Sequence, residues 1–109
     1  MIDYKKGNVI LVPFPFSDQS GVKKRPAVIV SSEAYNNLYQ DVVICAITSR
    51  IDNKLFALED WKTGGLLFPS AIKPVISTID RHIIIKTIWS LSSSDMLIVE
   101  RVKKEIFGT

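Results

Sequence analysis

Short runs of β-branched and aliphatic residues, separated by polar and turn-forming segments, recur along almost the whole chain. Runs of this length and composition predict β-strands. They cover residues 8–14, 25–31, 41–48, 54–59, 71–78 and 82–91, with 54–59 the weakest. The predicted strand 41–48 contains a continuous apolar run at 42–47, which predicts burial on both faces, as in a barrel wall or a closed sandwich.

The end of the chain carries the one convincing helical pattern. The Ser-Ser-Ser-Asp segment at 92–95 supplies an N-cap and a carboxylate for the first turn. Lys103, Lys104 and Gly108 suit a helix C-terminus. The apolar stripe between them is Leu97, Val99, Val102 and Ile106. A short capped helix or a polar loop is expected over 32–37, so the chain is predicted to be mainly β with a C-terminal helix.

Composition narrows the class of protein. The chain has 109 residues, 47% hydrophobic and 23% charged, which is typical of one folded domain spanning residues 1–109. Cys45 lies inside an apolar run and is expected to be a buried thiol. One Cys and one His exclude a conventional zinc site, and no cofactor is expected.

Charge and hydropathy bear on location and partners. No segment reaches the roughly 18 apolar residues of a membrane span, and the first residues do not resemble a signal peptide. A cytoplasmic protein without membrane contact is therefore expected. The net charge of +3 comes from the first loop and the C-terminal third. This balance is compatible with a nucleic-acid partner, although many soluble proteins share it.

Two polar clusters fall at the ends of neighbouring predicted strands. Lys-Lys-Arg-Pro at 23–26 opens the second run, and Thr-Ser-Arg at 48–50 closes the third. Pro26 favours an extended Arg25, so the second strand is expected to begin there. The simplest antiparallel register places Arg25 opposite Thr48. Phe14 is expected beside Arg25 on the other side, with the loop 15–24 overhanging the same end of the sheet.

A guanidinium beside a hydroxyl, flanked by cations, suits a phosphate. Arg25 can stabilise the charge that develops on a phosphate during RNA cleavage, and Thr48 can donate to it or orient the 2′-OH. These are the predicted catalytic residues. The predicted substrate-binding residues are Phe16, Ser17, Asp18, Lys23, Lys24, Pro26, Ser49 and Arg50. His82 lies on a different turn and receives no role.

Each of these features also has a plainer interpretation. Arg25 alone is compatible with a surface cation, and Thr48 with an ordinary strand end. Trp61 and Trp89 could stack bases, but filling a core or an interface is the commoner role of such side chains. Only the convergence of the two clusters favours a functional site.

Several segments, in this order, resemble the MazF/PemK-like toxins of bacterial toxin–antitoxin pairs. The first three are Gly-Asn-Val-Ile-Leu-Val-Pro-Phe-Pro-Phe at 7–16, Lys-Arg-Pro-Ala-Val-Ile-Val-Ser at 24–31 and Asp-Val-Val-Ile-Cys-Ala-Ile-Thr-Ser-Arg at 41–50. Residues 65–70 and 78–80 are similar to later segments of the family. The resemblance implies a compact, SH3-like antiparallel β-barrel with a C-terminal helix, which forms a homodimer.

The resemblance also implies an activity. The family cleaves single-stranded RNA at short sequences without a metal, leaving a 2′,3′-cyclic phosphate and a 5′-OH. Its catalytic Arg and Thr fall on Arg25 and Thr48. A cognate antitoxin is expected to lay an acidic segment across the dimer. The cleavage sequence does not follow, because Val75, Ser77 and Trp89 stand where the family often has Gln, Arg and Gly.

Two other classes of protein remain open on the sequence. One is a gyrase-poisoning toxin of the CcdB type, which relies on an exposed Trp at the end of its C-terminal helix. Here the chain ends Glu-Ile-Phe-Gly-Thr at 105–109, which argues against that class. The other is a catalytically silent, RNA-binding β-barrel.

Overall fold

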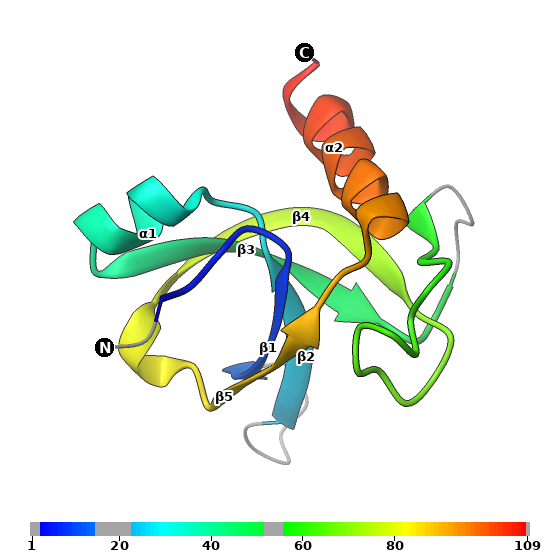
Figure 1. Cartoon of the computed structure of the whole chain (residues 1–109), viewed down its shortest axis with the longest axis horizontal. Coiled ribbons are helices and arrows are strands. Elements are labelled where there is room, and N and C mark those ends of the chain that lie inside the picture. Colours follow the sequence, from blue (N-terminus) through cyan, green and yellow to red (C-terminus); the bar gives the residue numbers. More distant parts are fainter. Residues whose placement is uncertain (1–2, 15–22, 52–55, 109) are drawn as a thin grey trace.

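The computed structural model describes residues 3–14, 23–51 and 56–108. Within them, five strands form one antiparallel sheet in the order β4-β3-β2-β1-β5, which curves into an open barrel (Figure 1). The strands are β1 (Asn8–Phe14), β2 (Lys23–Ile29), β3 (Asp41–Thr48), β4 (Ala71–Asp80) and β5 (Lys86–Ser90). The helices are α1 (Glu33–Leu38), the 3₁₀ turn η2 (Arg81–Ile83) and α2 (Ser93–Phe107). The predicted mainly β fold with a C-terminal helix is confirmed.

Strands β2 and β3 pair in the predicted register. Ala27 lies opposite Ala46, and Ile29 lies opposite Ile44. On the other side of β2, Val12 rather than Phe14 lies opposite Arg25. Phe14 lies opposite Lys23, two residues from Arg25, because β2 begins earlier than predicted, at Lys23.

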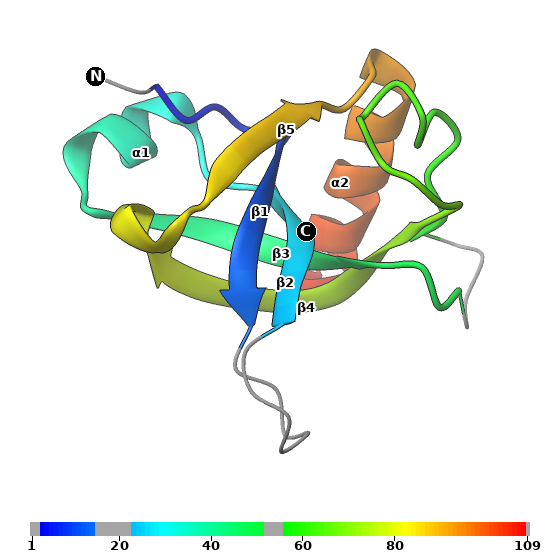
Figure 2. The same cartoon turned by 90° about the horizontal axis from the view of Figure 1, so that it is seen from below.

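The sheet buries apolar side chains on both faces. On β3, Val42 and Ile44 enter the cluster inside the curve, whereas Cys45 and Ile47 enter the cluster on the α2 side. This alternation follows from the two-residue period of a strand. It confirms the prediction that 41–48 is buried on both faces. Figure 2 shows the strands curving around the interior, with α2 to one side.

The caps of α2 are those predicted. The Ser92 hydroxyl accepts a hydrogen bond of 3.1 Å from the Asp95 N–H, and Gly108 ends the helix with a φ of 74°. The apolar stripe was wrong at one position, since Leu97 is 64% exposed and Ile98 is buried in its place. Ile98 and Val102 are four residues apart and share a helix face, from which Leu97 is turned by about 100°.

Two predicted strands differ from those observed. β5 covers only Lys86–Ser90, because the Asp80 carboxylate accepts a 2.8 Å hydrogen bond from the His82 N–H and starts η2 instead. Residues 56–59 do not form a strand, although Ala57 makes an isolated bridge to Ala71. The N–H of Glu59 donates to a side chain of α2 in place of a neighbouring strand. The rest of that prediction, 54–55, lies outside the described residues.

A buried amide anchors α1, and the helical alternative for 32–37 was therefore correct. Asn36 is fully buried and donates from Nδ2 to the carbonyls of Tyr4 and Ser31, at 2.8 and 3.2 Å. The Ser31 hydroxyl donates to Asn36 Oδ1 and accepts from the Val43 N–H. These bonds hold α1 against the junction of β2 and β3. Among the described residues, no helix has the length and apolar character that crossing a bilayer requires.

Candidate functional site

Arg25 and Thr48 lie together at one end of the sheet. Continuing the β2–β3 register by two positions sets Arg25 opposite Thr48, and opposite residues of an antiparallel pair project from the same face. Both side chains are half-buried. They line a hollow of about 310 Å³, here called the Arg25 hollow. Its lining is Arg25, Ala46, Ile47, Thr48, Lys73, Val75 and Ser77.

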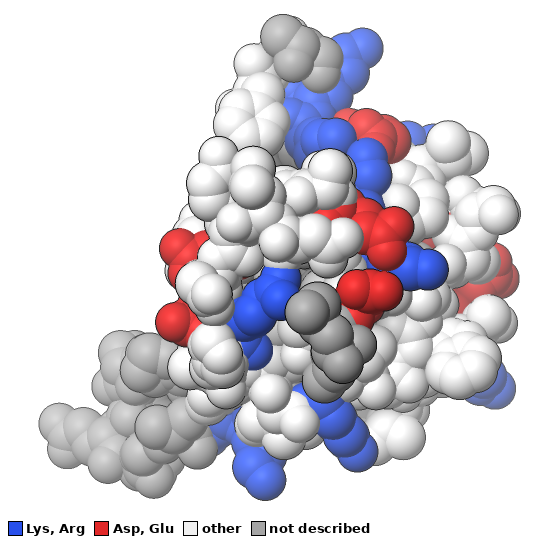
Figure 3. Space-filling view, turned by 60° about the vertical axis from the view of Figure 1, so that its left-hand side comes forward, with Lys and Arg blue, Asp and Glu red and all other residues white. Residues whose placement is uncertain are grey.

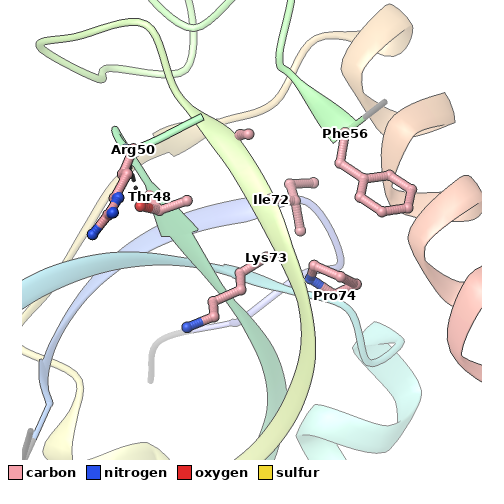
Figure 4. A pocket seen from close by; sticks show the side chains of 7 residues that line it. Thr48, Arg50, Phe56, Ile72, Lys73 and Pro74 are labelled. Carbon is pink, nitrogen blue, oxygen red and sulfur yellow. Dashed lines mark hydrogen bonds between the residues drawn. The ribbon is translucent and has the colours of Figure 1, made fainter. Parts of the chain in front are cut away.

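Thr48 also borders a second hollow of about 310 Å³, here called the Arg50 hollow (Figure 4). Its lining is Thr48, Arg50, Phe56, Ala71, Ile72, Lys73 and Pro74. The Thr48 Oγ1 accepts a hydrogen bond of 3.1 Å from the Arg50 N–H. This bond orients the hydroxyl and leaves its own proton for a second partner. Thr48 therefore sits between two cavities, each with an arginine.

Other predicted binding residues line a larger cavity of about 500 Å³, here called the apolar groove. They are Lys24 and Pro26 of β2, and Ser49, which directly follows β3. The further lining of the groove includes Leu11, Leu66, Leu67, Phe68, Lys86 and Ile88, and Arg25 borders it as well. Alternation along β2 separates Lys24 and Pro26 from Arg25. The predicted cluster is thus divided between two sides of one strand.

The remaining predicted residues are placed less centrally. Lys23 is exposed at the start of β2, and its backbone lies opposite Phe14. Phe16, Ser17 and Asp18 lie outside the described residues.

His82 is far from Thr48. Asp80, which binds its ring Nδ1 at 2.8 Å, pairs with Asp41 at the start of β3, whereas Thr48 ends that strand. Seven residues of strand span roughly 20 Å. The hydrogen bond from the His82 backbone N–H, followed by that from its ring, lowers the pKa of Asp80 below its usual value. This pair caps η2 at a distance from the site.

The sequence reasoning missed three side chains. Lys73 borders both hollows around Thr48. Phe68, 64% exposed, and Lys86 border the apolar groove. A proline at 74, inside a predicted strand, was a signal for a local irregularity. The direction of the Lys73 side chain depends on how β4 pairs with β3, and the sequence does not specify that pairing.

The two tryptophans have different surroundings. Trp61 packs against the core on the α2 side. Trp89 is 62% exposed, so of the two expected roles, filling a core or an interface, it does not fill the core of this chain. Its Cβ lies close to Gly65, where a side chain would meet Ile88 at 2.6 Å and where φ is +82°. The turn at Gly65, which borders the apolar groove, therefore requires glycine.

The site is cationic. None of the described residues that line the two hollows and the apolar groove is acidic, while Lys24, Arg25, Arg50, Lys73 and Lys86 all border them. Elsewhere the charges are mixed, and Figure 3 shows Asp and Glu interspersed with Lys and Arg over the face that it draws. A lining with cations and hydroxyls but no carboxylates suits a polyanion such as a nucleic-acid backbone.

A sequence profile of a known family matches nearly the whole chain. The family is described as the PemK-like, MazF-like toxin of type II toxin–antitoxin systems, and the match covers residues 5–107. The chain belongs to this family. Among the curated proteins, no sequence matches it significantly.

Solved structures show that the fold is that of the MazF toxins. In a MazE–MazF complex from Deinococcus radiodurans, one chain aligns with a TM-score of 0.77 and 19% identity, covering 99% of both chains. For an endoribonuclease in complex with its cognate antitoxin, from a mycobacterial species, the values are 0.74 and 18%, covering 99% of this chain and 96% of that one. The Mycobacterium tuberculosis toxin MazF-mt6 gives 0.76 and 18%, with coverage of 93% and 96%.

Proposed function

We propose that residues 1–109 form one toxin domain that cleaves single-stranded RNA without a metal. The observation that supports this most directly is that Arg25 and Thr48 share one open hollow in a member of the PemK-like, MazF-like toxin family. One structure of the same fold is described as an endoribonuclease bound to its cognate antitoxin. The cationic, acid-free lining supports an RNA substrate over an uncharged ligand.

The reaction is an internal transfer at phosphorus. The ribose 2′-oxygen attacks the adjacent phosphorus, the bond from phosphorus to the 5′-oxygen breaks, and a 2′,3′-cyclic phosphate and a 5′-OH remain. The 2′ oxygen loses one proton and the 5′ oxygen gains one, so no water is consumed. The Arg25 guanidinium binds the non-bridging oxygens as negative charge develops on them. The Thr48 hydroxyl, oriented by the Arg50 N–H, donates to the same phosphate or to the 2′-oxygen.

The surrounding side chains bind the rest of the strand. Lys23, Lys24 and Arg50 contact flanking phosphates. The apolar groove receives a nucleobase, because single-stranded bases stack on aromatic and apolar surfaces beside cations. Phe68 is the exposed aromatic residue at that groove. Phe16, Ser17, Pro26, Asp18 and Ser49 complete the proposed substrate-binding set.

We further propose that the toxin forms a homodimer and binds an acidic antitoxin. MazE–MazF complexes share its fold, and the acid-free lining of the site is complementary to a carboxylate-rich segment. Leu67 and Phe68 are 85% and 64% exposed, and apolar exposure of this degree is typical of an association surface.

The central test is cleavage of single-stranded RNA by the purified protein in EDTA. Arg25→Ala should lower the rate by about 10²-fold or more, as removal of a charge-stabilising donor does. Arg101→Ala, which removes an exposed arginine of α2, is the matched control and should cleave normally. The products should end in a cyclic phosphate and a 5′-OH. Wild-type protein without cleavage products, or full activity in Arg25→Ala, would contradict the proposal.

A further inference from the structure

Strand β4 contains a large bulge beside the candidate site. Cys45 pairs with Ile76 and Ile47 pairs with Ile72. One β3 residue, Ala46, therefore faces three β4 residues, 73–75. Pro74, in the middle of this segment, has no N–H to donate to the ladder. It is tolerated here because residues within a bulge are not paired in the ladder. Bulges of this kind change the direction of side chains and are common beside functional sites.

The bulge directs Lys73 toward Thr48. Lys73 borders both the Arg25 hollow and the Arg50 hollow, and Thr48 is the one other residue that the two linings share. Figure 4 shows the Lys73 side chain extending from β4 toward the side on which Thr48 lies, with the Arg50 side chain beside Thr48. A nucleic-acid strand that passes from one hollow to the other must therefore pass Lys73.

The charge of Lys73 is not compensated by the protein in the described part of the chain. Its exposed ammonium makes no ion pair or hydrogen bond with the residues described there. Arg25 and Arg50 stand on either side of it, and the described residues that line the two hollows include no carboxylate.

We propose that Lys73 is a phosphate-binding residue, which holds the RNA phosphate on the Arg50 side of Thr48. This inference rests on the proposed ribonuclease function and assigns a further contact to the same site. Lysine binds phosphate as a compact point charge with three donors. Its contribution is to affinity and to placement of the strand, so the chemical step at Arg25 and Thr48 proceeds without it.

The test compares Lys73→Ala, Lys73→Arg and wild type. Binding is measured by fluorescence anisotropy of a labelled, random-sequence 2′-O-methyl RNA oligonucleotide, which lacks the attacking hydroxyl, at several salt concentrations. Loss of one phosphate contact should weaken binding several-fold at low salt and reduce the slope of log K against log salt by about 0.7. Lys73→Arg should keep the wild-type slope. In cleavage of single-stranded RNA, Lys73→Ala should raise KM and leave kcat nearly unchanged.

Lys104→Ala is the matched control, because it removes one exposed lysine from the end of α2 and changes the net charge equally. It should keep the wild-type slope and KM. A wild-type slope in a folded Lys73→Ala protein that still cleaves RNA would overturn the role of Lys73 alone. Wild-type protein that does not cleave RNA would instead overturn the proposed function, and the inference with it.

Discussion

Thr48 connects the elements of the candidate site. It ends β3, lies opposite Arg25 in the continued register, and accepts a hydrogen bond from the Arg50 N–H. Its single hydroxyl is therefore oriented by the backbone two residues later. This bond favours one position of the hydroxyl oxygen before a substrate binds, which contributes to preorganisation of a catalytic donor.

The hydroxyl of Thr48, rather than its shape, should matter for cleavage. Thr48→Val removes the hydroxyl at constant volume and should lower kcat about 10-fold to 100-fold, less than Arg25→Ala, because one neutral donor is lost. Thr48→Ser keeps the hydroxyl and should retain most of the rate. Single-turnover cleavage of RNA measures the chemical step directly. Equal rates in Thr48→Val and wild type would remove Thr48 from the reaction.

At the residue scale, the sequence predicted the pairing of Arg25 with Thr48, because that pairing depends only on the lengths of two strands. Two apolar runs of similar length give one simple register, and this places Arg25 opposite Thr48. Lys73 was missed because its direction depends on a bulge between β3 and β4. The exposed positions of Leu97 and Trp89 also depend on tertiary packing.

At the element scale, Asp95 joins α2 to the segment before the apolar groove. The carboxylate is fully buried and accepts hydrogen bonds from the N–H groups of Glu59 and Asp60, at 2.8 and 2.9 Å. The sequence indicated Asp95 as a first-turn residue of a capped helix, which is correct. Its second role was not predictable, because the partners lie about 35 residues away in sequence. The same bonds explain why 56–59 is not a strand.

Removal of the Asp95 carboxylate should destabilise the fold. Asp95→Ala leaves two backbone N–H groups without acceptors in a part-buried place, and each unsatisfied group costs roughly 1–3 kcal/mol. We therefore expect the free energy of unfolding in urea to fall by about 2–4 kcal/mol. Ser94→Ala, at an exposed position of the same turn, is the control and should change it little. An unchanged urea midpoint in Asp95→Ala would show that these bonds contribute nothing to stability.

At the scale of the whole molecule, the chain leaves much apolar surface uncovered. Exposed large side chains include Leu38, Tyr39, Leu67, Phe68, Val75, Ile83, Ile85, Trp89, Leu97 and Phe107. Scattered apolar residues are normal on a monomer, but adjacent pairs such as Leu67 and Phe68 are typical of association surfaces. The family was predictable from short segments spread over the chain, whereas this surface depends on how the elements pack.

The molecular mass in solution should correspond to two chains. Light scattering at micromolar concentration should give about twice the 12.2 kDa of one chain. The association should survive 0.5 M salt, because burial of apolar surface is not screened as exposed ion pairs are. A mass near 12.2 kDa under both conditions would contradict the homodimer. A dimer that dissociates in salt would indicate association through charge instead.

The bulge in β4 has one more consequence, which concerns solubility. β4 is an outer strand of the sheet, and unpaired outer strands invite other chains to extend the hydrogen-bonded ladder into aggregates. The bulge around Pro74 interrupts the regular backbone of this edge, and the charge of the neighbouring exposed lysine discourages the approach of an incoming strand. Growth of a continuous sheet of many chains along β4 is therefore disfavoured.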